Sequence, residues 1–148
     1  MSFSTEIEHY RQAGLDFVVT ARGRRDSQNQ PADASWSATM IAHHMADADM
    51  HFAIRIREVL VHDTPALSVF NEELYAEKLE YQRRPIEPAL LLIKSIREET
   101  SDLLVGVPDD AWARTGIRTD GTSFTLSQLV KKATDHAQEH IEQLRNAL

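Results

Sequence analysis

The sequence predicts an all-α protein whose 148 residues form a single domain, a four-helix bundle over residues 1–148. Three observations lead to this fold. Apolar residues recur at alternating three- and four-residue steps in four separate segments, which is the spacing of one buried helix face. Each apolar stripe is narrow, and four such helices bury their stripes most economically against one another. The link between the second and third helices is long enough for a crossover, so the bundle need not run simply up and down.

The first helix is expected from about Thr5 to Arg25, and Gly23 with a polar run at residues 27–31 should end it. Its stripe consists of Ile7, Tyr10, Gly14, Phe17 and Ala21. Gly14 is the weak member, because glycine costs helix stability and has no side chain to bury.

The second helix is expected to begin at Ser35 or Ser37, either of which can cap it, and to run to about His62. Its stripe consists of Ile41, Met45, Ala48, Phe52, Ile56 and Val59. A helix turns about 100° per residue, which places His44 roughly 70° from the centre of this stripe, at the edge of the core. By the same count His43 lies roughly 170° away and is expected to face solvent.

Residues 63–87 form a long connection with a proline near each end, and Asn71–Leu74 is expected to start a short helix inside it. The third helix is expected to open with Pro88, which suits a first turn, and to stop at Gly106. Its predicted apolar face consists of Leu92, Ile93, Ile96 and Leu103.

Residues 108–112 are typical of a turn or a single helical turn, and an Asp-Gly pair at residues 120–121 then predicts a small hairpin. Thr125 and Gln128 match a capping box, which should start the last helix. Its stripe consists of Leu126, Leu129, Val130, Ala133, Ala137, Ile141 and Leu144. His140 falls inside this stripe, and His136 lies roughly 80° from its centre.

His136 and His140 are four residues apart, so their rings stack on one face of the last helix and can share one metal ion. His44 would bring a third imidazole from the second helix, since bundles build metal sites from side chains on facing helices. Three histidine ligands leave an open coordination position for water or substrate. The alternative is that the pair is inert, because histidines at this spacing are common on surface helices.

Composition excludes several classes of function. The formal charge of -7 at pH 7 argues against a nucleic-acid partner, which needs clustered basic residues. No apolar stretch approaches the length of a membrane span, and the amino end is too polar for a signal peptide. The chain has no cysteine, which excludes disulfides, thiolate ligands and a cysteine nucleophile and favours a cytoplasmic location.

Several motifs in this order and spacing resemble the DinB/YfiT-like superfamily. They are Trp36, the run Ile41-Ala42-His43-His44-Met45-Ala46-Asp47, Arg84-Pro85-Ile86-Glu87, and His136-x-x-x-His140-Ile141. The resemblance covers the chain from Trp36 onward. It implies a four-helix bundle with an unusual crossover, a divalent metal (zinc or nickel) held by His44, His136 and His140, and a homodimer, although no apolar seam in the sequence marks an interface.

The resemblance implies more than one activity. Some members are regarded as metal-dependent hydrolases, others transfer bacillithiol or mycothiol to electrophiles, and others are isomerases that use such a thiol. Two positions depart from the pattern of the YfiT-like sequences. Asp49 stands where a second histidine often follows His44, and Arg118 stands where a histidine often precedes the Asp-Gly turn.

The expected function is a metal-dependent enzyme that activates a low-molecular-weight thiol cosubstrate for transfer to a small electrophile, because the ion can deprotonate a bound thiol. One alternative is a hydrolase that uses water activated on the ion. Another is a non-enzymatic metal-binding or structural bundle. His51 and Arg55 share the flank of His44 and are candidates for a substrate pocket, although such side chains more often cover apolar surface.

No general base can be assigned from the sequence, although the connection at residues 63–87 could bring Glu77 or Glu80 over the site. Glu139 completes an H-x-x-E-H pattern in which the glutamate would be a general base. Its phase, roughly 140° from the apolar stripe, points it to solvent. Only eight residues follow His140, which leaves no room for a distant acidic ligand, so the peptidase reading is rejected.

Overall fold

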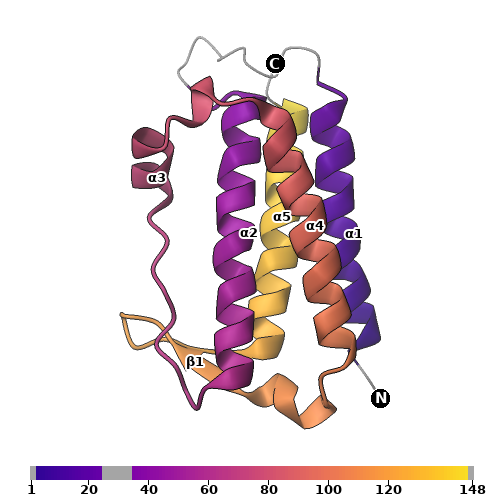
Figure 1. Cartoon of the computed structure of the whole chain (residues 1–148), viewed down its shortest axis with the longest axis vertical. Helices are drawn as coiled ribbons and strands as arrows, with labels where there is room; N and C mark the ends of the chain where they lie inside the picture. The colour runs from indigo at the N-terminus through magenta and orange to yellow at the C-terminus, as the bar shows by residue number, and fades with distance from the viewer. Residues whose placement is uncertain (1–2, 25–34, 147–148) are drawn as a thin grey trace.

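The computed structural model describes residues 3–24 and 35–146 and shows a four-helix bundle with one long crossover (Figure 1). The bundle helices are α1 (Ser4–Arg22), α2 (Ala38–Val61), α4 (Ile86–Val105) and α5 (Leu126–Asn146). The smaller elements are helix α3 (Glu72–Lys78), the 3₁₀ turns η1 (Tyr81–Arg83) and η2 (Asp109–Ala113), and strands β1 (Thr115–Ile117) and β2 (Ser123–Thr125). The predicted fold is therefore confirmed.

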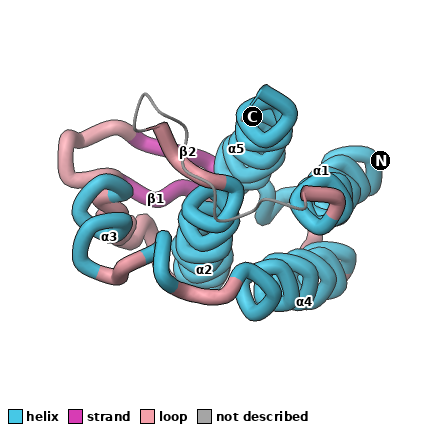
Figure 2. The backbone as a smooth tube through the Cα atoms, turned by 90° about the horizontal axis from the view of Figure 1, so that it is seen from above, coloured by secondary structure: helices cyan, strands magenta, loops and turns pink. Residues whose placement is uncertain are grey.

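The crossover sets the order in which the helices run. In Figure 1, α1 and α5 run upward, whereas α2 and α4 both run downward. The connection after α2 returns along the outside of the bundle through α3 before α4 begins (Figures 1 and 2). Each helix packs against two others: α1 against α4 and α5, and α2 against α4 and α5. The first half of α2 consequently lies beside the second half of its antiparallel neighbour α5.

Helix α2 is the most deeply buried of the four, and this corrects one prediction. Ser37 caps it by accepting a hydrogen bond from the Met40 amide at 3.2 Å. Every residue from Ala38 to Asp49 except Met40 is buried, because the crossover covers the face that a simple bundle would leave open. His43 was expected in solvent, yet it is 4% exposed and its Nε2 lies 2.9 Å from the carbonyl oxygen of Pro85. Because α2 is covered on both sides, more of its residues are buried than the single apolar stripe predicted from the sequence.

The predicted apolar face of the third bundle helix is correct at Ile93, which is buried, but wrong at Leu92 and Leu103. α4 begins at Ile86, two residues before Pro88, and ends before Gly106. Leu92 and Leu103 are 36% and 37% exposed. The buried face instead consists of Ala89, Leu90, Ile93, Arg97, Thr100, Ser101 and Leu104. Three polar residues lie in the centre of this face, so a count of apolar positions identifies only part of it.

Local signals at the other helix ends agree with the structure. α1 ends at Gly23 as predicted, whereas the expected end at Arg25 and the polar run at residues 27–31 lie outside the described residues. Strands β1 and β2 pair antiparallel around a turn in which Gly121 has a φ of 85°. The capping box is present: the Gln128 amide donates to Thr125 Oγ1 and the Thr125 amide donates to Gln128 Oε1.

Arg97 occupies the middle of the core and joins the four bundle helices. Its guanidinium donates two hydrogen bonds of 2.8 Å to the carboxylate of Asp49 on α2. It also donates to the carbonyl oxygens of Tyr10 on α1 at 2.8 Å and Ala133 on α5 at 3.0 Å. Gly14 makes room for this arginine, because a Cβ at Gly14 would lie 2.7 Å from Arg97 Cδ. The glycine that weakens the predicted stripe is thus required by packing.

The crossover is attached to α2 by side chains rather than by a core of its own, since α3 buries none of its residues. The ring of Phe70 stacks on His44 and on His51, with centroids 5.8 Å and 4.7 Å away. The Tyr81 hydroxyl donates a 2.5 Å hydrogen bond to Asp47 Oδ2. In the described parts of the chain, no helix combines the length and apolarity that crossing a membrane requires.

Candidate metal centre

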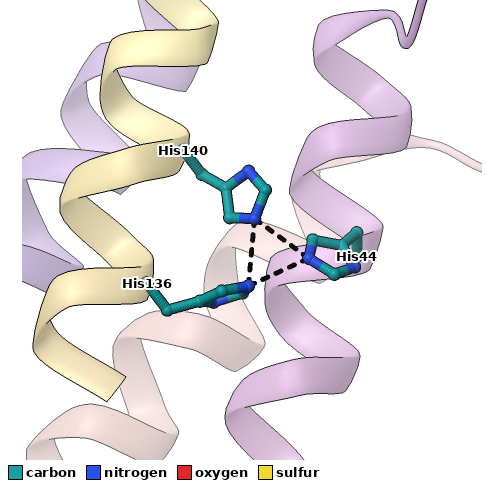
Figure 3. Close-up of side chains that lie close together, drawn as sticks. All are labelled: His44, His136 and His140. Carbon is teal, nitrogen blue, oxygen red and sulfur yellow. Dashed lines mark hydrogen bonds between the residues drawn. The ribbon is translucent and has the colours of Figure 1, made fainter. Parts of the chain in front are cut away.

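Helices α2 and α5 bring the three histidines singled out by the sequence to one point. The Nε2 atoms of His44, His136 and His140 form a triangle in which every side measures 3.0 Å. Figure 3 shows His44 reaching from α2 toward the two rings on α5, which lean the same way from successive turns. Of the histidine, aspartate and glutamate side chains that the structure describes, these three form the one group able to share an ion.

Hydrogen bonds alone cannot satisfy this triangle. The Nε2 atom of a neutral imidazole either carries a hydrogen or offers a lone pair. Among three such atoms at least two are of the same kind, so at least one contact sets two hydrogens or two lone pairs against each other. A cation that accepts all three lone pairs removes the conflict, and divalent zinc binds histidine nitrogens at about 2.0–2.1 Å, which suits ligand atoms this close together. The donor set therefore fits a divalent metal ion.

Gln143 fixes the state of one of these rings. His140 Nδ1 lies 2.7 Å from Gln143 Oε1, one turn further along α5. A carbonyl oxygen can only accept, so Nδ1 carries the hydrogen and Nε2 keeps its lone pair turned toward the other histidines. Metal-binding histidines usually have such a partner on the second nitrogen, which sets the tautomer and the orientation of the ring.

Burial keeps the other two imidazoles neutral. Desolvation, followed by the nearby His140, lowers the pKa of His44 to about 3. The same two causes, with a smaller contribution from His44, lower the pKa of His136 to about 2. Both rings are therefore uncharged at pH 7, which is the protonation state that metal binding requires.

Aromatic rings from α2, from the segment just before it and from the crossover lie against the cluster. Trp36 makes an edge contact with His44 at a centroid distance of 5.3 Å, and Phe70 stacks on the same imidazole. Phe52, also on α2, lies next to His136 of α5, with 6.0 Å between the ring centroids. Electrostatic interactions are stronger beside apolar rings than in bulk water, so these rings strengthen the interactions of a bound cation.

The crossover brings an acidic side chain to the cluster, but it is neither of the two expected residues. Oε2 of Glu72, the first residue of α3, lies 3.7 Å from His44 Nε2. Glu80 instead pairs with Arg83, and Glu77 is exposed. Asn71 positions the start of α3 by accepting a 3.1 Å hydrogen bond from the Leu74 amide. Glu139 is exposed on the outer face of α5, as its phase predicts.

A cavity of about 200 Å³ adjoins the cluster, between α2, the crossover, the hairpin and α5. Its polar lining includes His136 and Glu72 near the cluster, together with Arg55 and Arg118. Its apolar lining includes Ala48, Phe52, Leu67, Val69 and Phe70. Of the two residues predicted for a substrate pocket, Arg55 lines this cavity, whereas His51 contacts Phe70 and lies 3.2 Å from the Tyr75 hydroxyl.

Three residues at the site had no assigned role from the sequence. Gln143 carried a signal that could have been read, since it lies three residues after His140 and therefore on the same face of the helix. Glu72 and Arg118 carried none, because each lies on a segment whose position depends on tertiary contacts. Hydrogen bonds between Leu67 and Ile117 and between Ile117 and Pro65 tie the crossover to the hairpin and hold both segments beside the cavity.

Comparison with known proteins finds bacterial relatives that are longer than this chain. The model of the DinB superfamily matches residues 11–144. A protein of Geobacillus thermodenitrificans is 30% identical over 82% of this chain and 70% of its own length. YfiT of Bacillus subtilis is 24% identical over 74% of this chain and 62% of its own length. Both carry the name of a metal-dependent hydrolase whose activity is inferred.

Solved structures show the same fold. YfiT, whose four-helix bundle is described as having an unusual topology, superposes with a TM-score of 0.87 over 95% of this chain and 82% of YfiT, at 22% identity. A mycothiol-dependent maleylpyruvate isomerase matches with a TM-score of 0.74 at 12% identity, over the whole of this chain and 62% of the isomerase. The family model covers nearly all of the bundle, and the chain therefore belongs to the DinB superfamily.

Proposed function

We propose that this protein is a metal-dependent enzyme in which His44, His136 and His140 hold a divalent ion, zinc or nickel, and that it activates a low-molecular-weight thiol for transfer to a small electrophile. The observation that carries the proposal is the Nε2 triangle, whose contacts cannot all be hydrogen bonds. The names of the relatives support a metal-dependent enzyme.

The nucleophile must come from outside the chain. An ion in this site would lower the pKa of a thiol or water bound beside it, so that a nucleophile is present at pH 7. The sequence contains no cysteine, so a reacting thiol arrives as a cosubstrate. A thiol is favoured over water by the fold match with the mycothiol-dependent isomerase, which extends over the whole of this chain.

Glu72 is the residue best placed to take the proton. Its carboxylate lies beside His44 Nε2 and is also open to solvent, with 59% of the side chain exposed, so it can pass a proton to water. In the transfer, the sulfur forms a bond to the electrophilic carbon and the leaving group departs with its bonding electron pair. The thiol proton moves to the Glu72 carboxylate, and from there it can pass to solvent.

Hydrolysis is the second candidate function, and Glu72 is the observation that favours it. A carboxylate at this distance from the cluster can equally remove a proton from water, and general bases of this kind typically contribute 10²–10⁴-fold to the rate. The relatives named as metal-dependent hydrolases agree with this alternative.

Elemental analysis of untagged protein tests the metal site. We expect about one equivalent of zinc or nickel in the wild type and a large loss in His44→Ala and His136→Ala. His51→Ala is the matched control, because His51 lies on α2 two turns beyond His44 and outside the triangle. Metal content that is low in the wild type, or unchanged in the two cluster variants, would refute the metal site.

Turnover assays separate the reactions. The metal-loaded protein is mixed with monobromobimane and, in parallel, with bacillithiol, mycothiol, glutathione or cysteine, and adduct formation is followed by fluorescence. A transferase accelerates adduct formation above the spontaneous rate with one class of thiol, and this excess disappears in His136→Ala. A hydrolase instead cleaves an ester such as 4-nitrophenyl acetate with metal and without thiol. A bundle that binds metal stoichiometrically and does neither has a structural or binding role.

A further inference from the structure

Two guanidinium groups share the cavity with the histidine cluster. Arg55 comes from α2, and Arg118 follows strand β1 in the hairpin. The Phe52 ring lies between Arg55 and the cluster: its centroid is 5.8 Å from Arg55 Cζ and 6.0 Å from the centroid of the His136 ring. A molecule in this cavity can therefore contact a guanidinium at one end and the cluster at the other.

Carboxylates act on both arginines only from a distance, Glu58 on Arg55 and Asp120 on Arg118. No carboxylate in residues 3–24 and 35–146 lies within ion-pair distance of either guanidinium. Burial lowers the pKa of Arg55, and repulsion from Arg118 lowers it further, partly offset by Glu58. Outside the cavity lining, Lys132 Nζ lies 5.1 Å from the Phe124 ring that Arg118 also contacts. This end of the cavity therefore presents, beside an apolar wall, two guanidinium groups without an ion-pair partner among the residues that the structure describes.

Arg55 is held in a fixed orientation. Its Nε and Nη2 donate to the carbonyl oxygen of Ser68 at 3.0 Å and 2.5 Å. A guanidinium has five N–H donors, so these two contacts leave three donors for another partner. Arg118 differs, because its side chain makes no hydrogen bond to another described residue. Attachment of the crossover therefore does not explain why an arginine stands at this position.

We propose that Arg55 and Arg118 bind the anionic group of the substrate, a carboxylate or a phosphate, so that the electrophile handled by this site is a small anion with an apolar middle. This rests on the proposed function, because it makes the histidine cluster the reacting end of the same cavity. The ring of Phe52 sets the spacing, so the anionic group and the reacting atom are separated by about the length of one aromatic ring. Guanidinium groups suit both anions because their paired donors match carboxylate and phosphate oxygens.

Arg118 is a better position than Arg55 for a substitution that tests anion binding. Replacing Arg55 also removes the hydrogen bonds to Ser68 and could loosen the crossover, so loss of binding would have two explanations. Arg118→Gln removes the charge from an exposed side chain and leaves those bonds in place. Arg11→Gln is the matched control: it removes one positive charge from α1, which does not contribute to the cavity.

Ligand binding measured by ¹⁹F NMR tests the proposal without requiring turnover. The probes are 4-fluorobenzoate, 4-fluorophenyl phosphate and the neutral 4-fluorobenzamide, titrated into metal-loaded wild type, Arg118→Gln and Arg11→Gln. We expect wild type and Arg11→Gln to bind at least one anionic probe about tenfold or more tightly than the amide, as charge-assisted hydrogen bonds allow. Arg118→Gln should lose most of this preference while its affinity for the amide stays the same. The stronger of the two anions identifies the carboxylate or phosphate class.

The same titration with His44→Ala separates this inference from the metal site. A carboxylate could bind the ion itself, in which case the preference for anions would disappear in His44→Ala and persist in Arg118→Gln, and the proposal would be overturned. Equal affinities of acid, phosphate and amide in the wild type would overturn it as well. Retention of the preference in His44→Ala, with its loss in Arg118→Gln, would support the arginine site even if elemental analysis refuted the metal.

Discussion

Arg97 carries a charge in the centre of the bundle, where it is 1% exposed. A buried ion pair gains little net stability over apolar packing, but removing one partner leaves an uncompensated charge and costs about 3–5 kcal/mol. Here Asp49 neutralises the charge, and two helix carbonyl oxygens accept two of the three remaining donors. The pair therefore makes the positions of the four bundle helices depend on one another. It also explains why residue 49 is an aspartate, although YfiT-like sequences often have a histidine at this position.

Gly14→Ala is expected to destabilise the protein. Its Cβ would lie 2.7 Å from Arg97 Cδ, and the arginine cannot move aside easily because four hydrogen bonds hold its guanidinium. Overpacking of this kind costs about 1–3 kcal/mol, which outweighs the helix-propensity gain of up to about 1 kcal/mol. Urea unfolding measures the loss. Gly106→Ala is the control, since its nearest atom would be 3.7 Å away, and equal stabilities of the two variants would contradict the packing argument.

The histidine cluster predicts how stability of the metal-free protein depends on pH. The folded pKa values of His44 and His136 are about 3 and 2, below the value near 6.5 expected in the unfolded chain. Between these limits the unfolded chain binds more protons, so stability falls as the pH falls below about 6.5 and is unaffected above it. Each histidine should cost up to about 2 kcal/mol between pH 7 and pH 5, at about 1.4 kcal/mol per pH unit.

Urea unfolding of chelator-treated protein at pH 7 and pH 5 measures this loss. His44→Gln should lose less stability than the wild type over the same interval, because one of the two buried imidazoles is gone. Contributions from the remaining titrating groups cancel in the comparison. A loss of the same size in both proteins would show that His44 does not resist protonation in the folded state.

At the scale of single elements, the crossover depends on a few side chains. Helix α3 buries none of its residues, and Phe70 anchors the preceding segment between the imidazoles of His44 and His51. Because Glu72 follows two residues later, the position of Phe70 also determines where that carboxylate lies. The crossover should therefore open locally without unfolding of the bundle, as segments with few buried contacts do.

Phe70→Ala is expected to speed amide hydrogen exchange across residues 68–79 by tenfold or more, because the stacking on two rings is lost. Global stability should change by a smaller amount, since the bundle core is not touched. Val69→Ala is the matched control, because the Val69 side chain is 63% exposed. Exchange that stays slow in Phe70→Ala would mean that contacts such as Tyr81 with Asp47 are sufficient to hold the segment.

The elements that could be predicted from the sequence are those defined by neighbouring residues. The capping box at Thr125, the cap at Ser37 and the turn at Gly121 are local, and all three are present. Only part of the buried face of α4 could be found, because Arg97 lies at its centre and is stabilised only by a partner on another helix. His43 was misplaced for a similar reason, since the crossover that covers it comes from a distant part of the chain.

At the scale of the whole molecule, the helix order explains how residues 92 and 96 positions apart in the sequence meet. α2 and α5 are antiparallel neighbours, so His44 near the start of one lies opposite His136 and His140 toward the end of the other (Figures 1 and 3). Helical phase and the family resemblance together selected these residues from the sequence, although the same phase count misplaced His43. Glu72 and Arg118 could not be selected, because their positions depend on how the crossover and the hairpin fold over α2.

A bound ion should stabilise the whole bundle, because the cluster links α2 to α5 and forms only when the chain is folded. A ligand at 100 times its dissociation constant adds about 2.7 kcal/mol if it does not bind the unfolded chain. In a domain of this size each kcal/mol raises the melting temperature by about 2–4 °C, so saturating zinc or nickel should raise it by about 5–10 °C. Differential scanning fluorimetry of chelator-treated protein, with and without added metal, measures the shift. His136→Ala should show little or none of it, whereas His51→Ala should respond as the wild type does. A rise of the same size in His136→Ala would mean that the metal acts elsewhere on the surface and that the triangle does not hold it.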